Sequence, residues 1–269
     1  MRKYRIPERC KDSCVLLFYR LFSPFPLSKK QVCRHLEKNQ LAWKKVLSED
    51  CQEDRMEHQE KLTNFVYGSR YTADYNSCEV IAVYHALLAL NRAGKTQSHP
   101  TRRAGGVWRK PKIFLTPPCA LKKRVNSAQK KKYADSCDFP ELLAYFERNG
   151  ITCGGAFGTS PYALVRFFRA QGFPVMCLRY PEWKKICQTG SISKITGTND
   201  TFLFMAYNDA SSLRAMLHTM CVTKEPEGYR RHNDFSELKY YPTLQKAVES
   251  YQNGRSRAIF IMAVSSCFT

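Results

Sequence analysis

The chain has 269 residues, of which 43% are hydrophobic and 13% aromatic, values typical of a folded protein and incompatible with a wholly disordered one. Its formal net charge of +20 favours anionic partners in general, but twelve Lys or Arg and no Asp or Glu lie in the single segment 95–132. The charge is therefore concentrated in one stretch, and no nucleic-acid-binding motif accompanies it, so a nucleic-acid partner is not expected.

The twelve cysteines would favour a disulfide framework only in an oxidising compartment. The best candidate for a secretory signal, residues 14–22, contains an arginine, lacks a small-residue cleavage site after it and is too short to span a bilayer. We therefore expect a soluble, cytoplasmic protein with reduced thiols. Secretion by a route that needs no signal peptide is the alternative.

Residues 1–60 are predicted to form a helical extension, because apolar residues recur there at loose helical spacing. These residues are Val32, Leu36, Leu41, Val46 and Leu47. The extension also holds residues with metal-ligating side chains, namely Cys10, Cys14, Cys33 and His35. Their spacing matches no compact zinc pattern, so neither a metal ion nor another cofactor is expected.

Residues 61–269 are predicted to form the main domain. Its most informative segment is 78–90, where apolar residues recur at the spacing of an amphipathic helix. Asn76 or Ser77 can cap this helix at its start. Cys78 is thereby placed on the first helical turn.

A basic insertion at about 95–135 separates this helix from the rest of the domain. Asp138 and Glu141 have the spacing of a capping box at the start of the next helix. The remaining predicted elements are helices at 142–149 and 161–171, strands at 173–180, 201–207, 215–224, 229–232 and 258–264, and a short helix at 244–251. Helices followed by strands predict an α+β fold in which an N-terminal helical half packs on a C-terminal antiparallel sheet.

Cys78 is the candidate nucleophile. A thiol at a helix N-terminus faces unpaired backbone N–H groups and the positive end of the helix dipole, and both favour the thiolate. The backbone N–H of the cysteine can also face a developing oxyanion. Free cysteines are common in protein cores, however, so this position alone does not establish catalysis.

His218 is the candidate base, because it lies near the start of a predicted strand. After one turn the chain reaches Asn233 and Asp234, and a side chain from that neighbouring strand can fix the orientation of the imidazole. His85 lies two helical turns from Cys78, about 10 Å along the axis, which is too far for a direct base. The other histidines occur in polar contexts or beside the orienting residue, and they are His35, His58, His99 and His232.

This order of residues resembles that of papain-like cysteine peptidases. Three strings look most like the bacterial double-glycine leader peptidase group and its stand-alone relatives: Asn76-Ser-Cys-Glu-Val-Ile-Ala82, Phe157-Gly-Thr-Ser-Pro161 and Leu217-His-Thr219. The resemblance covers about residues 65–265. It implies a papain-like fold with Cys78 as nucleophile, His218 as general base and acid, and Asn233 or Asp234 as orienting residue.

The chain departs from the family in two places. Relatives usually carry a glutamine five or six residues before the cysteine as an oxyanion donor, whereas this chain has Thr72 and Ala73 there. Asn76 is the substitute donor that we consider. The basic insertion at about 95–135 is also foreign to the compact family pattern.

The sequence thus predicts a cysteine peptidase that cleaves a peptide or isopeptide bond through a thioester acyl-enzyme. An acyltransferase is a close variant, because an amine can capture the thioester in place of water. The alternative is a catalytically silent peptide-binding domain of the same fold that recruits an acidic partner through its basic insertion. The expected partners are a peptide or protein substrate and, in the alternative, that acidic protein.

Overall fold

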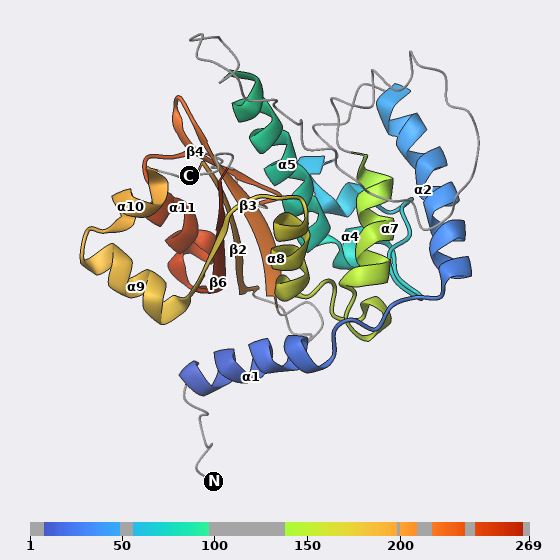
Figure 1. Cartoon of the computed structure of the whole chain (residues 1–269), viewed down its shortest axis with the longest axis horizontal. Helices are drawn as coiled ribbons and strands as arrows, with labels where there is room; N and C mark the ends of the chain where they lie inside the picture. Colours follow the sequence, from blue (N-terminus) through green and yellow to red (C-terminus); the bar gives the residue numbers. More distant parts are fainter. Residues whose placement is uncertain are drawn as a thin grey trace, which may run out of the picture.

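The computed structural model describes residues 8–48, 56–96, 138–197, 200–208, 217–234 and 240–265. Its fold is α+β, with N-terminal helices packed on a C-terminal, open, six-stranded antiparallel sheet (Figure 1). The order of helices before strands therefore predicted the fold class correctly. Nearly all of the basic insertion, together with His99, lies outside the described residues.

The helical half is centred on α5 (Cys78–Thr96). The other helices around it are α1 (Glu8–Leu21), α2 (Lys29–Ser48), η1 (Gln59–Lys61), α4 (Ala73–Asn76), α7 (Phe139–Asn149), η2 (Cys153–Gly155) and α8 (Pro161–Ala170). Aromatic side chains from α2, α5 and α7 meet edge to face in the core between them, with Trp43 and Tyr84 at a centroid distance of 6.1 Å. The helical extension thus contributes to the central packing.

The sheet has the strand order β1-β6-β2-β3-β4-β5, and all neighbours pair antiparallel. The strands are β1 (Val175–Arg179), β2 (Thr201–Tyr207), β3 (Leu217–Glu225), β4 (Gly228–His232), β5 (Tyr240–Tyr241) and β6 (Ala258–Val264). On one side of the sheet lie α9 (Tyr180–Gln188), α10 (Ile192–Thr196), α11 (Leu244–Glu249) and η4 (Tyr251–Gly254).

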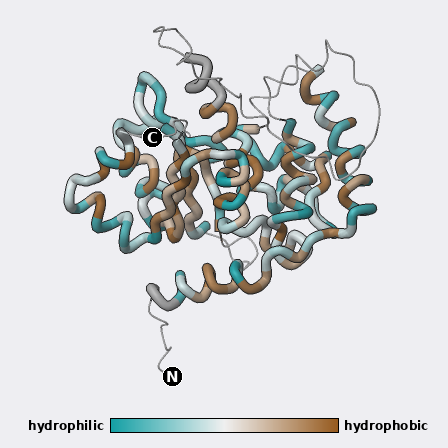
Figure 2. Tube along the Cα trace, in the orientation of Figure 1, coloured by the Kyte–Doolittle hydropathy of each residue, from teal (hydrophilic) through white to brown (hydrophobic). Residues whose placement is uncertain are grey.

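Both faces of the sheet are covered, so the central strands are buried throughout. Because side chains alternate along a strand, Leu203 and Met205 of β2 join the core shared with α5. Phe202 and Phe204 instead join a second core with α9 and α11. Figure 2 shows apolar segments gathered where the central strands meet the helices.

Several local expectations differ from the structure. Leu41 and Leu47 are exposed, whereas Val32, Leu36, Trp43 and Val46 of α2 are buried. Asp138 is the N-cap residue of α7, as predicted, but the reciprocal pair of hydrogen bonds of a capping box is not formed. Helices α9 and α10 were not predicted. The predicted strand 173–180 ends at Arg179 as β1, and α9 begins at the next residue, Tyr180.

Helix α1 contacts both halves of the molecule. Near its start, Asp12 accepts hydrogen bonds from the Tyr207 hydroxyl at 2.8 Å and from the Arg257 guanidinium at 2.7 Å, both on the sheet side. Near its end, the Tyr19 hydroxyl donates to the carbonyl of Phe157 at 3.2 Å, on the helical side. Figure 1 shows α1 running along the underside of the molecule.

The cysteines differ in state. Within the described ranges the free thiols are Cys14, Cys78, Cys153, Cys177, Cys187 and Cys221. Cys33 is disulfide-bonded, so the prediction of reduced thiols is wrong for this residue. No helix in the described part of the chain is long and apolar enough to cross a membrane.

Candidate active site

Cys78 is the first residue of α5, as predicted, and its side chain is buried with 7% exposure. Helix α5 packs against β3, and the backbone N–H of Thr219 in that strand donates to the Cys78 sulfur. The sulfur therefore meets the strand one residue beyond His218.

The thiol also has a carboxylate neighbour. Cys78 donates a hydrogen bond to Glu79, whose Oε2 accepts from the backbone N–H of Thr159 at 3.3 Å. Burial raises the pKa of the Cys78 thiol, and the charge of Glu79 raises it further. Burial likewise raises the pKa of Glu79 to about 7. The resting cysteine is thus a protonated thiol, in contrast to the thiolate expected from the helix dipole.

His218 lies in β3 and is held by its neighbours in the sheet half. Its Nε2 is 2.8 Å from the backbone carbonyl oxygen of Asn233, and its ring stacks on that of Tyr251 with the ring centroids 6.1 Å apart. Burial lowers the pKa of His218, so the imidazole is neutral at pH 7.

The strand register determines which face His218 occupies. His218 pairs with Ala206, which packs in the second core with Tyr251. Thr219 pairs with Met205, which packs in the core with α5. The imidazole therefore lies on the face opposite to α5, and the described residues include no hydrogen bond between Cys78 and His218.

The two orienting candidates have different surroundings. Asn233 has a left-handed backbone conformation (φ 56°), and it contacts His218 through its carbonyl oxygen while its side-chain amide donates to Gln59. Asp234 is buried and accepts from the guanidinium Nε of Arg231 at 2.6 Å. The structure thus brings Asn233 to His218 through the main chain and pairs Asp234 with an arginine.

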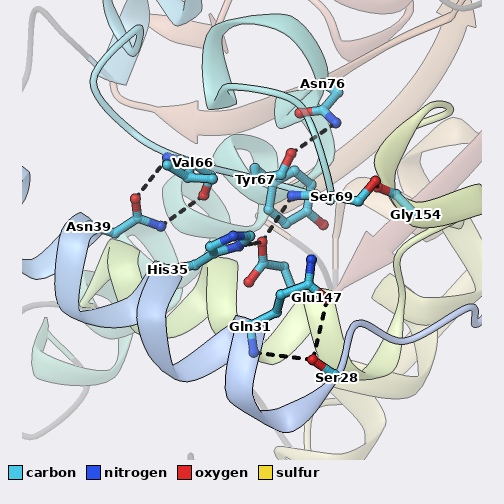
Figure 3. Close-up of polar contacts among 11 residues, drawn as sticks. Ser28, Gln31, His35, Asn39, Val66, Tyr67, Ser69, Asn76, Glu147 and Gly154 are labelled. Carbon is cyan, nitrogen blue, oxygen red and sulfur yellow. Dashed lines mark hydrogen bonds and ion pairs between the residues drawn. The ribbon is translucent and has the colours of Figure 1, made fainter.

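Asn76, the tentative oxyanion donor, is already engaged. Its Nδ2 donates to the carbonyl of Tyr67 at 3.2 Å and to that of Gly155 at 2.6 Å. Because a carboxamide has two N–H bonds, no donor remains for an oxyanion. Asn76 instead ties the Tyr67 segment to η2 beside the start of α5 (Figure 3).

Helix α2 fixes the same Tyr67 segment from the other side. Asn39 brackets the backbone of Val66, donating to its carbonyl at 2.9 Å and accepting from its N–H at 2.8 Å. His35 Nδ1 lies 2.7 Å from Glu147 Oε1, which also accepts from the N–H of Gly68 (Figure 3). These contacts set the position of the chain just before α4 and Cys78.

A second polar cluster was not predicted. His232 Nδ1 lies 2.7 Å from Glu57 Oε1, and the His232 ring stacks on that of His85 at 4.4 Å. Glu57, in the segment before η1, belongs to no recognisable motif. It lies 175 residues from His232 in the sequence, so local patterns could not predict their contact. The one sequence signal for this cluster was His85, which lies two helical turns after Cys78.

Comparisons with protein-family models, with curated proteins and with solved structures find no match for this chain.

Proposed function

We propose that the chain is a cysteine peptidase of papain-like architecture, held in a closed resting state. The proposal rests on one juxtaposition: the thiol that opens α5 contacts β3 at Thr219, directly after His218. Nε2 of His218 faces the carbonyl of Asn233 at 2.8 Å, which favours the tautomer with the proton on Nε2. Support for the proposal comes from the positions of three residues: Cys78 begins α5, His218 lies in β3 and Asn233 directly follows β4.

The reaction begins from a neutral pair. Nδ1 of His218 removes the thiol proton of Cys78 while the sulfur attacks the substrate carbonyl. For this step β3 must rearrange so that the imidazole reaches the face of the sheet on which α5 packs. The N–H groups of the first turn of α5 stabilise the resulting oxyanion. The tetrahedral intermediate then breaks down to a thioester, and the departing amine takes the proton from His218. Water then attacks the thioester with His218 as base, releasing the acid and restoring the thiol. An amine in place of water makes the chain an acyltransferase.

The second candidate is a catalytically silent peptide-binding domain of the same fold. It is favoured by the hydrogen bond from the Cys78 thiol to Glu79 and by the full engagement of the Asn76 amide, because both remove groups that catalysis needs. Its acidic partner would bind the basic insertion, which lies outside the described residues.

A panel of peptides carrying an electrophilic carbonyl, with mapping of the labelled cysteine, separates the two candidates. For the peptidase, Cys78 reacts faster than the exposed Cys14, and His218→Ala reduces the rate at Cys78 by at least about 100-fold. The buried Cys221, which lies in β3 with His218, serves as the internal control and stays unlabelled. Labelling of Cys78 that is unchanged by His218→Ala, or reaction at Cys14 alone, would overturn the proposal and favour the silent domain.

A further inference from the structure

We propose that Glu57, His85 and His232 form a binding site for a divalent first-row transition-metal ion, with zinc as the best fit. Each residue offers one ligand atom, and the three atoms lie within 4.8 Å of one another. The residues come from the segment before η1, from α5 and from β4, and each is buried with 6–7% exposure. The site is therefore built by the fold rather than by a local sequence motif.

The hydrogen bonds of the two imidazoles suit metal binding. Nε2 of His85 is 3.0 Å from the carbonyl of Met56, and Nε2 of His232 is 2.9 Å from the hydroxyl of Thr223. Metal-bound histidines commonly donate their second N–H to a carbonyl or another acceptor, which fixes the tautomer and the ring orientation. Nδ1 of each ring then remains as the ligand atom.

Glu57 supplies the anionic ligand. Its Oε2 accepts from the backbone N–H of Asn233 at 3.1 Å, which holds the carboxylate in place, while Oε1 faces His232. Without an ion, Nδ1–H of His232 donates to Oε1. Binding of an ion at Nδ1 requires the other tautomer, with the proton on Nε2 toward the Thr223 hydroxyl.

Three adjustments accompany binding. The rings of His85 and His232 stack with centroids 4.4 Å apart and an interplanar angle of 18°, so one ring must turn before both Nδ1 lone pairs point at one ion. Ligand atoms on one tetrahedral ion lie about 3.3 Å apart, given metal–ligand bonds of about 2.0–2.1 Å, so Glu57 Oε1 and His232 Nδ1 must separate slightly from 2.7 Å. The guanidinium of Arg230, 3.1 Å from the same oxygen, must also move away from the ion. Its side chain is 26% exposed and can turn toward solvent.

The donor set selects the class of ion. Two imidazole nitrogens and one carboxylate oxygen are typical ligands of zinc and of cobalt as its substitute, whereas magnesium and calcium prefer oxygen ligands alone. Three protein ligands leave a fourth position for water, as in open zinc sites. This inference is independent of the proposed peptidase activity, because none of the three residues is assigned to that reaction.

Titration of the ion-free, full-length chain with Co²⁺ tests the site directly. The expected result is one bound Co²⁺ with visible d–d absorption of a four- or five-coordinate ion, displaced by Zn²⁺ and unaffected by Mg²⁺. Glu57→Gln and His232→Ala should weaken binding by more than about 100-fold, and Thr223→Val, which removes a hydrogen bond to a ligand, by about 10-fold. His58→Ala is the matched control, since His58 also pairs with a glutamate, at 3.2 Å, but is more exposed and is not a member of the Glu57, His85 and His232 group.

Folding and adventitious binding are controlled separately. Circular dichroism of each ion-free variant shows whether it folds, and Zn²⁺ should raise the melting midpoint of the wild type and of His58→Ala but not of Glu57→Gln. Absence of stoichiometric binding to the wild type would overturn the proposal. So would strong sulfur-to-cobalt charge-transfer absorption, which indicates cysteine ligation, or equal binding by wild type and Glu57→Gln.

Discussion

The surroundings of the Cys78 thiol at the start of α5 have opposing effects on its ionisation. The helix terminus favours a thiolate at Cys78, whereas burial and the Glu79 carboxylate favour the protonated thiol. Burial is the largest cause of the raised pKa of the Cys78 thiol, and the charge of Glu79 adds to it because an interaction in a buried site is weakly screened. The identity of residue 79 thus contributes to the reactivity of residue 78.

Glu79→Gln should therefore raise the reactivity of Cys78. The amide carries no charge, so the pKa of the thiol falls and its alkylation at pH 8 becomes severalfold faster. Iodoacetamide kinetics with peptide mapping measure this rate. Glu60→Gln, which alters an exposed carboxylate, should leave the rate unchanged.

The same variant should change the pH dependence of stability. Because burial raises the folded-state pKa of Glu79 from 4.5 to about 7, its contribution is fully present below pH 4.5 and is lost as pH rises through about 7. The loss amounts to about 3 kcal/mol for a shift of this size. Urea unfolding at pH 5 and pH 8 should show this fall in the wild type and a smaller one in Glu79→Gln; equal slopes would contradict the assignment.

Gly158 makes the room for that carboxylate. Its φ is +61°, and a Cβ added there would lie 2.7 Å from Glu79 Oε2. Gly158→Ala should lower the free energy of unfolding by about 2–3 kcal/mol, through backbone strain and displacement of Glu79. Gly190→Ala is the matched control: its φ is +67° with nothing within 4 Å, so only the strain of about 1 kcal/mol remains. Equal losses in urea unfolding would show that Glu79 moves aside freely.

At the level of elements, the start of α5 and the identity of the long strands followed from local patterns, whereas α9, α10 and the contacts between faces did not. The predicted strands at 201–207 and 258–264 match β2 and β6, because long apolar runs leave no other reading. The face on which His218 lies depends on its register with Ala206 and on which side α5 packs. Both are long-range properties, so the sequence predicted the two site elements but not the relative placement of their side chains.

Helix α1 brings one side chain close to the start of α5. Its Tyr19 lies near both Cys78 and Glu79, whose charges add to burial in raising the pKa of Tyr19. Asp12→Ala removes the contacts with Tyr207 and Arg257, at a cost of about 1–2 kcal/mol for a partly buried pair.

In Asp12→Ala, alkylation of Cys78 should become faster because α1 loosens from the sheet half. The buried Cys221 should remain protected, which distinguishes local release of α1 from general unfolding. Arg20→Ala, at an exposed position of the same helix, is the control and should behave as wild type. Unchanged labelling in Asp12→Ala would show that α1 does not cover the thiol.

At the level of the whole molecule, the helical extension and the main domain share one core. Trp43 packs against Phe65, Tyr84 and Phe139. Trp43→Ala should therefore destabilise the chain by about 3–5 kcal/mol in urea unfolding, as for other buried aromatic residues. Leu41→Ala, in the same helix but 68% exposed, should change stability by less than about 0.5 kcal/mol. A minor effect of Trp43→Ala would mean that the extension unfolds separately.

The strand order has a consequence for how the chain folds. Strand β6 is the last in sequence, yet it pairs with β1 on one side and β2 on the other. Strand β1 therefore has no neighbour in the sheet until residues some eighty positions later have been synthesised. Such long-range pairing makes folding slow and leaves sheet edges exposed on a growing chain. The helical half can form on the ribosome, whereas completion of the sheet must wait for the C-terminal segment to leave the exit tunnel.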